Sequence, residues 1–265
     1  MSQHAIDLDA NAYATYATLQ LANGKEMLAE LAFRGDEQVL DIGCGPGILT
    51  ALIAQHIPHG HVTGIDASPA MITYAKNQAP PNATFQVMDA ARITLPENHF
   101  DLVFSNACFH WIEDQQGLLT GIRRVLKAHG LLRAQFLGHE ASIIRETAKA
   151  LCQSEPYSSY LKDFTWPKVN FRKEDYLALV RQVGGFEEVE VWETETQRAF
   201  NGEAHLEGWL SSMHRAIYTE PLPEPLREPF FQELVRRVLA AATKSADGTL
   251  TLGRGCRLHV RAKKA

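Results

Sequence analysis

The sequence lacks an apolar run long enough to cross a membrane, and its first residues lack a signal-like apolar core. Its four cysteines form no Cys-x-x-Cys pair, which argues against a zinc site and against a disulfide framework. Basic residues are not in excess, since 26 Lys and Arg stand against 31 Asp and Glu, for a net charge of −5. That balance disfavours a nucleic-acid-binding surface as the main function. We therefore expect a cytoplasmic monomer or dimer whose partner is a small molecule, with no metal, nucleic acid or membrane involved.

Two phosphate-binding signatures are also missing. A dinucleotide-binding loop needs Gly-x-Gly-x-x-Gly, but counting from Gly43 the third glycine position holds Ile48. The Gly-Lys-Ser/Thr ending of a P-loop is absent as well. A glycine-rich loop does follow the apolar run that ends at Ile42, and its notable residues are Asp41, Gly43, Cys44, Gly45 and Gly47. Such a loop between a strand and a helix lets a ligand approach the backbone closely.

Strand-like and helix-like patterns alternate through the first half of the chain. The expected strands are 38–42, 62–66, 84–88, 101–106 and 131–137. The expected helices between them are 48–57, 69–79 and 115–127. This alternation predicts a parallel sheet made of right-handed β-α-β units, and ligands bind such sheets beyond the carboxyl ends of the strands.

The flanking segments predict further elements. Residues 12–33 suggest two helices broken near Asn23 and Gly24, and residues 203–243 suggest a helical cap inserted before a last strand at 249–261. Helices are also expected at 140–153 and 173–183, and a strand around Val189 and Val191. The expected parts are an N-terminal helical lid (1–35), an α/β core (36–200), a helical cap (201–247), and a final core strand with a basic tail (248–265).

Acidic side chains end the second and third expected strands. Asp66 comes nineteen residues after Gly47 and can accept hydrogen bonds from both hydroxyls of a ribose. Its other interpretation is a cap for the helix that Ser68 and Pro69 begin. Asp89 ends the third strand and is followed by Ala90.

In their order and spacing these motifs resemble the class I S-adenosylmethionine-dependent methyltransferases. The run from Phe100 to Trp111, with Asn106 where the fourth strand opens, is similar to the fourth motif of that family. The resemblance covers roughly residues 36–136. It implies a Rossmann-like fold with a doubly wound, mostly parallel seven-stranded sheet, and S-adenosylmethionine as the cofactor. The cofactor-binding residues that it implies are Asp41, Gly43, Cys44, Gly45, Gly47, Asp66, Ala67, Met71, Asp89, Ala90 and Asn106. For Met71, a place in the core is the alternative to covering the adenine.

Two further features resemble the small-acid and juvenile-hormone-acid carboxyl methyltransferases. The first is Tyr16 to Gln20 on the N-terminal segment, and the second is Phe109 to Trp111 after the fourth strand. The layout after residue 170, with a strand, a helical cap and a final strand that ends in basic residues, resembles the trans-aconitate methyltransferases. The resemblance implies that Gln20 and Trp111 offer neutral N–H donors to a carboxylate acceptor, with Tyr16 nearby. A carboxylate is already ionised at neutral pH, so this reaction requires no catalytic base.

Several alternatives remain open from the sequence. His110 is a candidate base for methylation of a hydroxyl or phenol, or else a packed histidine. A non-catalytic protein that binds the cofactor is also possible, because a fold does not establish chemistry. The aromatic-rich second half either lines an acceptor pocket or forms core; its members are Tyr157, Tyr160, Phe164, Trp166, Trp209, Met213 and Tyr218.

Overall fold

The computed structural model describes residues 9–139, 142–164 and 169–265, which divide into two compact units. The sheet unit contains the described residues of 18–139, 168–194 and 256–265, and the helical unit contains those of 1–17, 140–167 and 195–255. The expected lid, 1–35, is thus divided after Ala17, and the part of the expected core that lies in 142–164 joins the helical unit.

The sheet unit is built on one twisted sheet with strand order β3-β2-β1-β4-β5-β8-β6. The strands are β1 (Gln38–Ile42), β2 (His61–Asp66), β3 (Ala83–Val87), β4 (Phe100–Asn106), β5 (Leu126–Leu137), β6 (Phe186–Phe200) and β8 (Leu250–Lys264). Strands β1 to β5 run parallel to one another, whereas β8 runs antiparallel to β5. A two-residue strand, β7 (Thr243–Lys244), pairs with β8 outside this row. The predicted doubly wound, mostly parallel α/β fold is confirmed.

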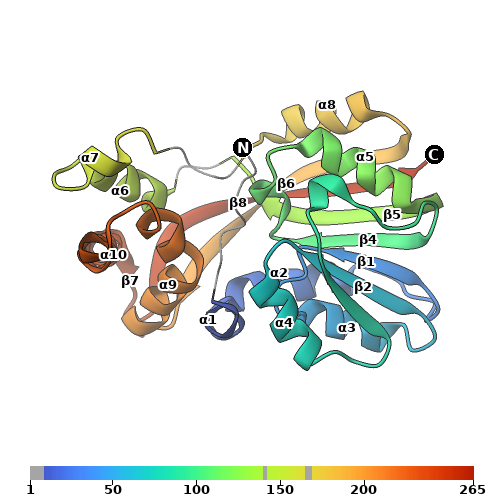
Figure 1. Cartoon of the computed structure of the whole chain (residues 1–265), viewed down its shortest axis with the longest axis horizontal. Coiled ribbons are helices and arrows are strands. Elements are labelled where there is room, and N and C mark those ends of the chain that lie inside the picture. The colour runs from blue at the N-terminus through green and yellow to red at the C-terminus, as the bar shows by residue number, and fades with distance from the viewer. Residues whose placement is uncertain (1–8, 140–141, 165–168) are drawn as a thin grey trace. The chain divides into compact units, whose positions relative to one another are not determined.

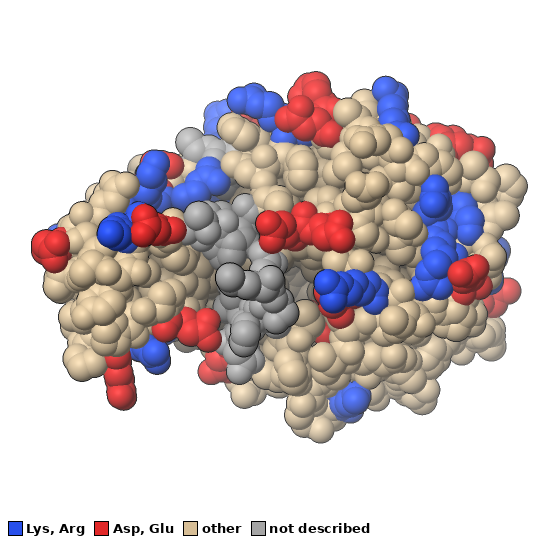
Figure 2. Space-filling model, turned by 45° about the horizontal axis from the view of Figure 1, so that its top comes forward, with Lys and Arg blue, Asp and Glu red and all other residues tan. Residues whose placement is uncertain are grey.

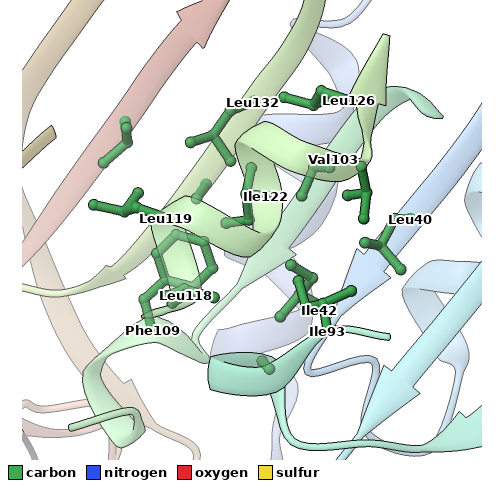
Figure 3. Close-up of a cluster of buried hydrophobic side chains, with 14 of the residues drawn as sticks. Leu40, Ile42, Ile93, Val103, Phe109, Leu118, Leu119, Ile122, Leu126 and Leu132 are labelled. Atoms are coloured by element: carbon green, nitrogen blue, oxygen red, sulfur yellow. The ribbon is translucent and has the colours of Figure 1, made fainter. Parts of the chain in front are cut away.

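Helices cover both faces of this sheet (Figure 1). Helices α2 (Thr18–Ala29), α3 (Ile48–His56) and α4 (Pro69–Asn77) lie on one face, and α5 (Gln115–Val125) and α8 (Lys173–Val183) lie on the other. Successive strand residues alternate between the two cores: Val39 and Leu102 face the first set of helices, while Leu40 and Val103 face the second (Figure 3). Burial on both faces explains why the strands read as continuous apolar runs.

The N-terminal segment differs from the prediction in one respect. Helix α1 (Ala10–Tyr16) ends at Ala17, and α2 continues unbroken through Asn23 and Gly24. The expected break at these two residues is therefore wrong. A side chain at Gly24 would collide with Leu49 of α3 and would stand 3.1 Å from the amide nitrogen of Asn106. Glycine is needed here for close packing, which outweighs its cost of about 1 kcal/mol to the helix.

The helical unit has its own aromatic core. It contains α1, α6 (Ile143–Cys152), α7 (Ser158–Leu161), α9 (Glu203–Thr219) and α10 (Glu224–Ala241). Tyr157 meets Phe230 edge to face at a centroid distance of 4.9 Å, and Phe230 also contacts Tyr218. Among the expected cap aromatics, Tyr160 is exposed and Trp166 lies outside the described residues. The buried members thus serve as core of this unit.

Charged side chains of both signs are interspersed over the face of the molecule shown in Figure 2, in keeping with the balanced composition. Within the described ranges, no helix combines the length and the apolarity that crossing a membrane requires.

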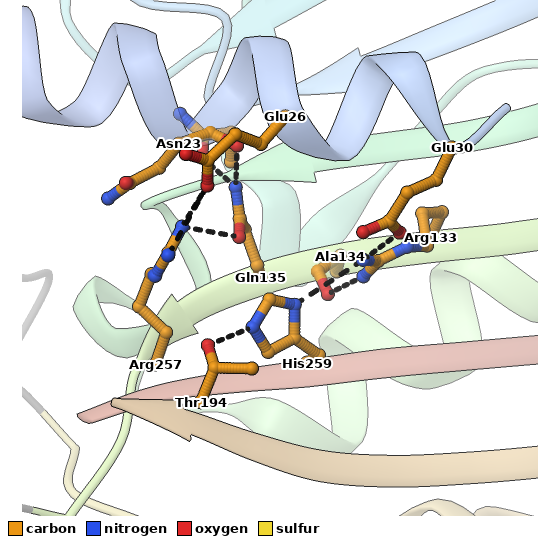
Figure 4. A network of polar contacts seen from close by, with 10 residues as sticks. Asn23, Glu26, Glu30, Arg133, Ala134, Gln135, Thr194, Arg257 and His259 are labelled. Carbon is orange, nitrogen blue, oxygen red and sulfur yellow. Dashed lines mark hydrogen bonds and ion pairs between the residues drawn. The ribbon is translucent and has the colours of Figure 1, made fainter. Parts of the chain in front are cut away.

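A polar network joins α2 to the strands beneath it (Figure 4). Arg133 of β5 is 2 % exposed, donates to Glu30 at 2.7 Å and to the carbonyl of Ala134 at 3.0 Å, and stacks over Trp192 with its guanidinium carbon 4.8 Å from the ring centroid. Nη2 of Arg133 also lies 3.3 Å from Nδ1 of His259. These contacts satisfy a buried cation, which would be costly if left unpaired.

His259 gives the sheet unit a pH-dependent stability. Burial, and then the positive charges of Arg133 and Arg257, lower the pKa of His259 from 6.5 to about 4. Between these values His259 binds a proton in the unfolded chain but not in the folded chain, so its contribution to the free energy of unfolding falls as pH falls through this window. The loss is at most about 3 kcal/mol.

We expect the free energy of unfolding of the wild type minus that of His259→Gln to fall as pH falls from 7 to 4.5, measured by urea unfolding of both proteins. His59→Gln, at an exposed position, is the matched control. An unchanged slope in the His259 variant would show that another group carries the effect.

Candidate active site

The glycine loop after β1 adopts a backbone that requires glycine. Gly43, Gly45 and Gly47 all have positive φ angles, of 70°, 53° and 82°. A side chain at Gly43 would also collide with Cys108, which follows β4. The amide of Gly43 donates to the carbonyl of Ile65 at 2.8 Å, which ties the loop to the end of β2. The loop therefore presents main chain rather than side chains at the carboxyl end of the sheet.

Asp66 connects that loop to the start of α4. Its Oδ2 accepts from the amide of Gly45 at 3.0 Å, and its Oδ1 accepts from the amide of Ser68 at 2.9 Å. The N-cap of α4 is Ser68, whose hydroxyl accepts from the amide of Met71, so Asp66 is not the helix cap. A carboxylate offers about four acceptor positions, and these two bonds leave capacity for the hydroxyls of a ribose.

Asp41 is a buried acid beneath the same loop. It is 2 % exposed, and its Oδ2 accepts from the hydroxyl of Thr50 in α3 at 2.6 Å. Burial raises its pKa to about 7, the Thr50 hydrogen bond opposes this rise, and the charge of Asp66 adds to it. Asp41 therefore changes charge close to neutral pH. Burial also raises the pKa of the Cys44 and Cys108 thiols, which stay protonated.

The adenine-side candidates lie around the ends of β2 and β3. Asp89 is exposed and accepts from the amide of Ala91 at 2.9 Å, while Ala90 begins the 3-10 helix η1 (Ala90–Arg92). Ala67 is exposed, whereas Met71 is only 3 % exposed. Its burial favours a place for Met71 in the core, and contact with the cofactor at these four positions stays a prediction.

Asn106 brings the N-terminal helix to the end of β4. Its amide nitrogen donates to the main-chain carbonyl of Gln20 at 3.0 Å, although the two residues are 86 positions apart. Its Oδ1 accepts from Gln135 of β5 at 2.8 Å, and Gln135 also donates to the carbonyl of Asn23 at 2.6 Å. Asn106, predicted to bind the cofactor, and Gln20, predicted to bind the methyl acceptor, are thus in direct contact. The next residue, Ala107, has a φ of 56°, a strained backbone of the kind that clusters at functional sites.

Trp111 lies on a short 3-10 helix, η2 (Phe109–Trp111), which the side chain of Gln115 holds in place. Gln115 is buried, and its amide nitrogen donates to the carbonyls of Phe109 at 2.7 Å and Ile112 at 2.6 Å. Its Oε1 accepts from the hydroxyl of Tyr176 in α8 at 2.9 Å. Every polar atom of Gln115 therefore contributes to fixing the turn that carries Trp111.

His110 is 6 % exposed, and its Nδ1 accepts from the amide of Leu137 at 3.4 Å. An accepting Nδ1 places the proton of the neutral ring on Nε2. Neither nitrogen then offers a free lone pair, which argues against His110 as a base. Tyr16 belongs to the helical unit, where its ring packs against Gly208 of α9, and its role toward an acceptor stays a prediction.

Sequence reasoning missed Gln115 and Gln135. Gln135 is a polar residue inside an apolar stretch, between Ala134 and Phe136. A buried polar side chain must find partners, so this pattern was an available signal for Gln135. Gln115 follows Glu113 and Asp114 and gives no such signal. Their partners are main-chain groups distant in the sequence, which a pattern does not identify.

The loop and strand ends fit S-adenosylmethionine. The glycines leave room at the backbone, and Asp66 retains acceptor capacity. Residues 39–130 match a family model described as a methyltransferase domain. The chain is 30% identical to a trans-aconitate 2-methyltransferase of Methylobacterium radiotolerans over 91% of this chain and 92% of that protein. The chain belongs to the trans-aconitate methyltransferase family. It is therefore an S-adenosylmethionine-dependent methyltransferase.

Other comparisons agree with this assignment. A trans-aconitate 2-methyltransferase of Delftia acidovorans is 28% identical over 92% of the methyltransferase and 93% of its own length. The crystal structure of the YcgJ protein from Bacillus subtilis superposes with a TM-score of 0.61 at 15% identity, covering 92% of the methyltransferase and 98% of YcgJ. At that identity the likeness concerns the fold alone.

Asp41 predicts a pH-dependent affinity for the cofactor. The ionised carboxylate favours a cationic ligand, and with a pKa of about 7 its ionised fraction falls about tenfold between pH 8 and 6. As pH falls from 8 to 6, we expect the Kd of S-adenosylmethionine to rise more in the wild type than in Asp41→Asn. The extra rise should be at most about tenfold, the loss of ionised Asp41. Calorimetric titration of both proteins measures the difference, and parallel profiles would contradict it.

Because Gln115 holds the turn that carries Trp111, we expect its replacement to affect both stability and acceptor binding. We expect Gln115→Leu to lower the free energy of unfolding by about 2 kcal/mol or more, because buried carbonyls lose their donors. It should also raise the acceptor KM more than it changes the Kd of the cofactor, because the turn that carries Trp111 loses two hydrogen bonds. Gln116→Leu, the exposed neighbour, is the control. A normal acceptor KM in Gln115→Leu would show that the position of Trp111 does not depend on the hydrogen bonds of Gln115.

Proposed function

We propose that this methyltransferase esterifies a carboxylate of a small polycarboxylic acid of the trans-aconitate type. The observation that carries the proposal is similarity along more than nine-tenths of the chain to proteins named trans-aconitate 2-methyltransferase. Similarity of that extent includes the segments on both sides of the cofactor loop. We further propose that the enzyme acts in the cytoplasm as a monomer or dimer, without a nucleic-acid or membrane partner.

The reaction asks little acid–base chemistry of the protein. S-adenosylmethionine supplies a methyl group that its sulfonium already activates. The new carbon–oxygen bond forms as the carbon–sulfur bond breaks, and no proton moves, because the acceptor carboxylate is ionised at neutral pH. Holding donor and acceptor in line contributes up to about 7–11 kcal/mol in favourable cases. The bonding of His110 is consistent with a reaction that needs no base.

Gln20 and Trp111 are proposed to grip the reacting carboxylate. An amide and an indole N–H are neutral donors, so they orient a carboxylate without cancelling the charge that makes it nucleophilic. Two observations support this role: the main chain of Gln20 is bonded to Asn106, and Gln115 fixes the turn of Trp111. Each proposed donor thus lies on a segment whose main chain is fixed by a side-chain amide.

The direct test is to identify the product. Purified protein with methyl-labelled S-adenosylmethionine should label trans-aconitate as a base-labile ester and should leave phenols and amines unlabelled. Label found only in base-stable ethers or amines would overturn the proposal.

The same assay tests the two donors. Gln20→Ala and Trp111→Phe should each raise the acceptor KM about tenfold, the effect of losing one hydrogen bond to a charged group, with a nearly unchanged Kd for the cofactor. Lys25→Ala, exposed on the same helix as Gln20, is the control. Loss of cofactor affinity instead would assign the two residues structural roles.

A further inference from the structure

Arg257 is a cation at the ligand edge of the sheet that is only loosely held. It lies on β8 opposite Leu137, the last residue of β5, and so at the carboxyl end of the parallel strands. In this fold that edge is where ligands bind. Its side chain is 17 % exposed and reaches toward α2 beside Gln135 (Figure 4).

The position of Arg257 is tied to the proposed acceptor site by two successive hydrogen bonds. Its Nη1 lies 3.4 Å from Oε1 of Gln135, and Gln135 donates to Asn106 at 2.8 Å. Asn106 in turn holds the carbonyl of Gln20. Gln135 therefore links the guanidinium of Arg257 to Asn106, the residue that contacts the helix carrying Gln20.

The present partners of Arg257 are weak ones. Both terminal nitrogens point at a single oxygen of Glu26, each at 3.4 Å, and the Glu26 side chain is 67 % exposed. Its Nε is buried without a hydrogen-bond partner among the described residues. Such a long, solvent-facing ion pair contributes little. A bidentate carboxylate is the ligand that a guanidinium fits best.

Arg133, the neighbouring arginine in the network, is held very differently. Its ion pair with Glu30 is short, at 2.7 Å, it also donates to a carbonyl, and it stacks on Trp192. Arg133 is thus engaged in the structure of the unit, whereas Arg257 can exchange Glu26 for a ligand. The comparison singles out Arg257 as the cation available to an anionic ligand at this edge.

We propose that Arg257 binds a second carboxylate of the acceptor, one that is not methylated, and thereby selects polycarboxylic over monocarboxylic acids. Glu26 occupies that position in the absence of the acceptor and competes with it. This inference rests on the proposed function, because it assumes that the acceptor is a carboxylic acid. It adds the residue that distinguishes acids by their number of carboxylates.

The test compares trans-aconitate, with three carboxylates, and crotonate, with one, as acceptors. Arg257→Gln should raise the KM for trans-aconitate about tenfold to a hundredfold, the effect of losing a charge-assisted bidentate pair, and the KM for crotonate less than about threefold. Arg257→Lys, which keeps the charge and loses the fork, should fall between. Glu26→Gln should lower the KM for trans-aconitate, because the competing carboxylate is gone.

Opposite effects of the Arg257 and Glu26 variants are the decisive result. Equal loss of both acceptors in Arg257→Gln, or a rise in KM for trans-aconitate in both Arg257→Gln and Glu26→Gln, would overturn the inference and show that the ion pair only positions α2. Calorimetric binding of trans-aconitate to the protein saturated with S-adenosylhomocysteine separates the two proposals. Binding that depends on Arg257 without turnover would refute the proposed function alone, and no binding by the wild type would refute both.

Discussion

The carboxylate of Asp66 is the constraint on which the rest of the site depends. One of its oxygens holds the amide of Gly45 and the other holds the amide of Ser68, so the glycine loop and the start of α4 are fixed to the end of the same strand. Because burial disfavours the charge of Asp66, these two amides are needed to satisfy it. The same carboxylate therefore shapes the glycine loop and retains further acceptor positions, which the predicted contact with a ribose requires.

A second set of contacts fixes the two segments that carry Gln20 and Trp111. Asn106 and Gln135 use their amide groups to bind main-chain carbonyls of α2, and Gln115 uses its amide to bind carbonyls of the turn that carries Trp111. In both cases a side-chain amide binds backbone, so the position of the segment is fixed whatever side chains it carries. Methyl transfer demands alignment more than acid–base chemistry, and amides that orient backbone supply alignment.

The two arginines of the polar network have partners of different strength. The buried Arg133 is paired with Glu30, stacks over Trp192 and contacts His259. Arg257 lies at the end of that network and has long contacts to an exposed acid. The difference follows from position: Arg133 lies midway along β5 and is 2 % exposed, whereas Arg257 lies opposite Leu137, the last residue of β5, and its side chain is 17 % exposed.

The sequence by itself determined the order of strands and helices, the glycine loop, and the acids at the strand ends, because each depends on residues that are neighbours in the chain. It predicted a helix break at Asn23 and Gly24, which the packing of Gly24 against Leu49 prevents. Only the tertiary structure decided which amides hold α2 and the turn of Trp111, and which arginine stays loosely paired. Those contacts join segments that are distant in the chain, and local pattern carries no information about such pairs.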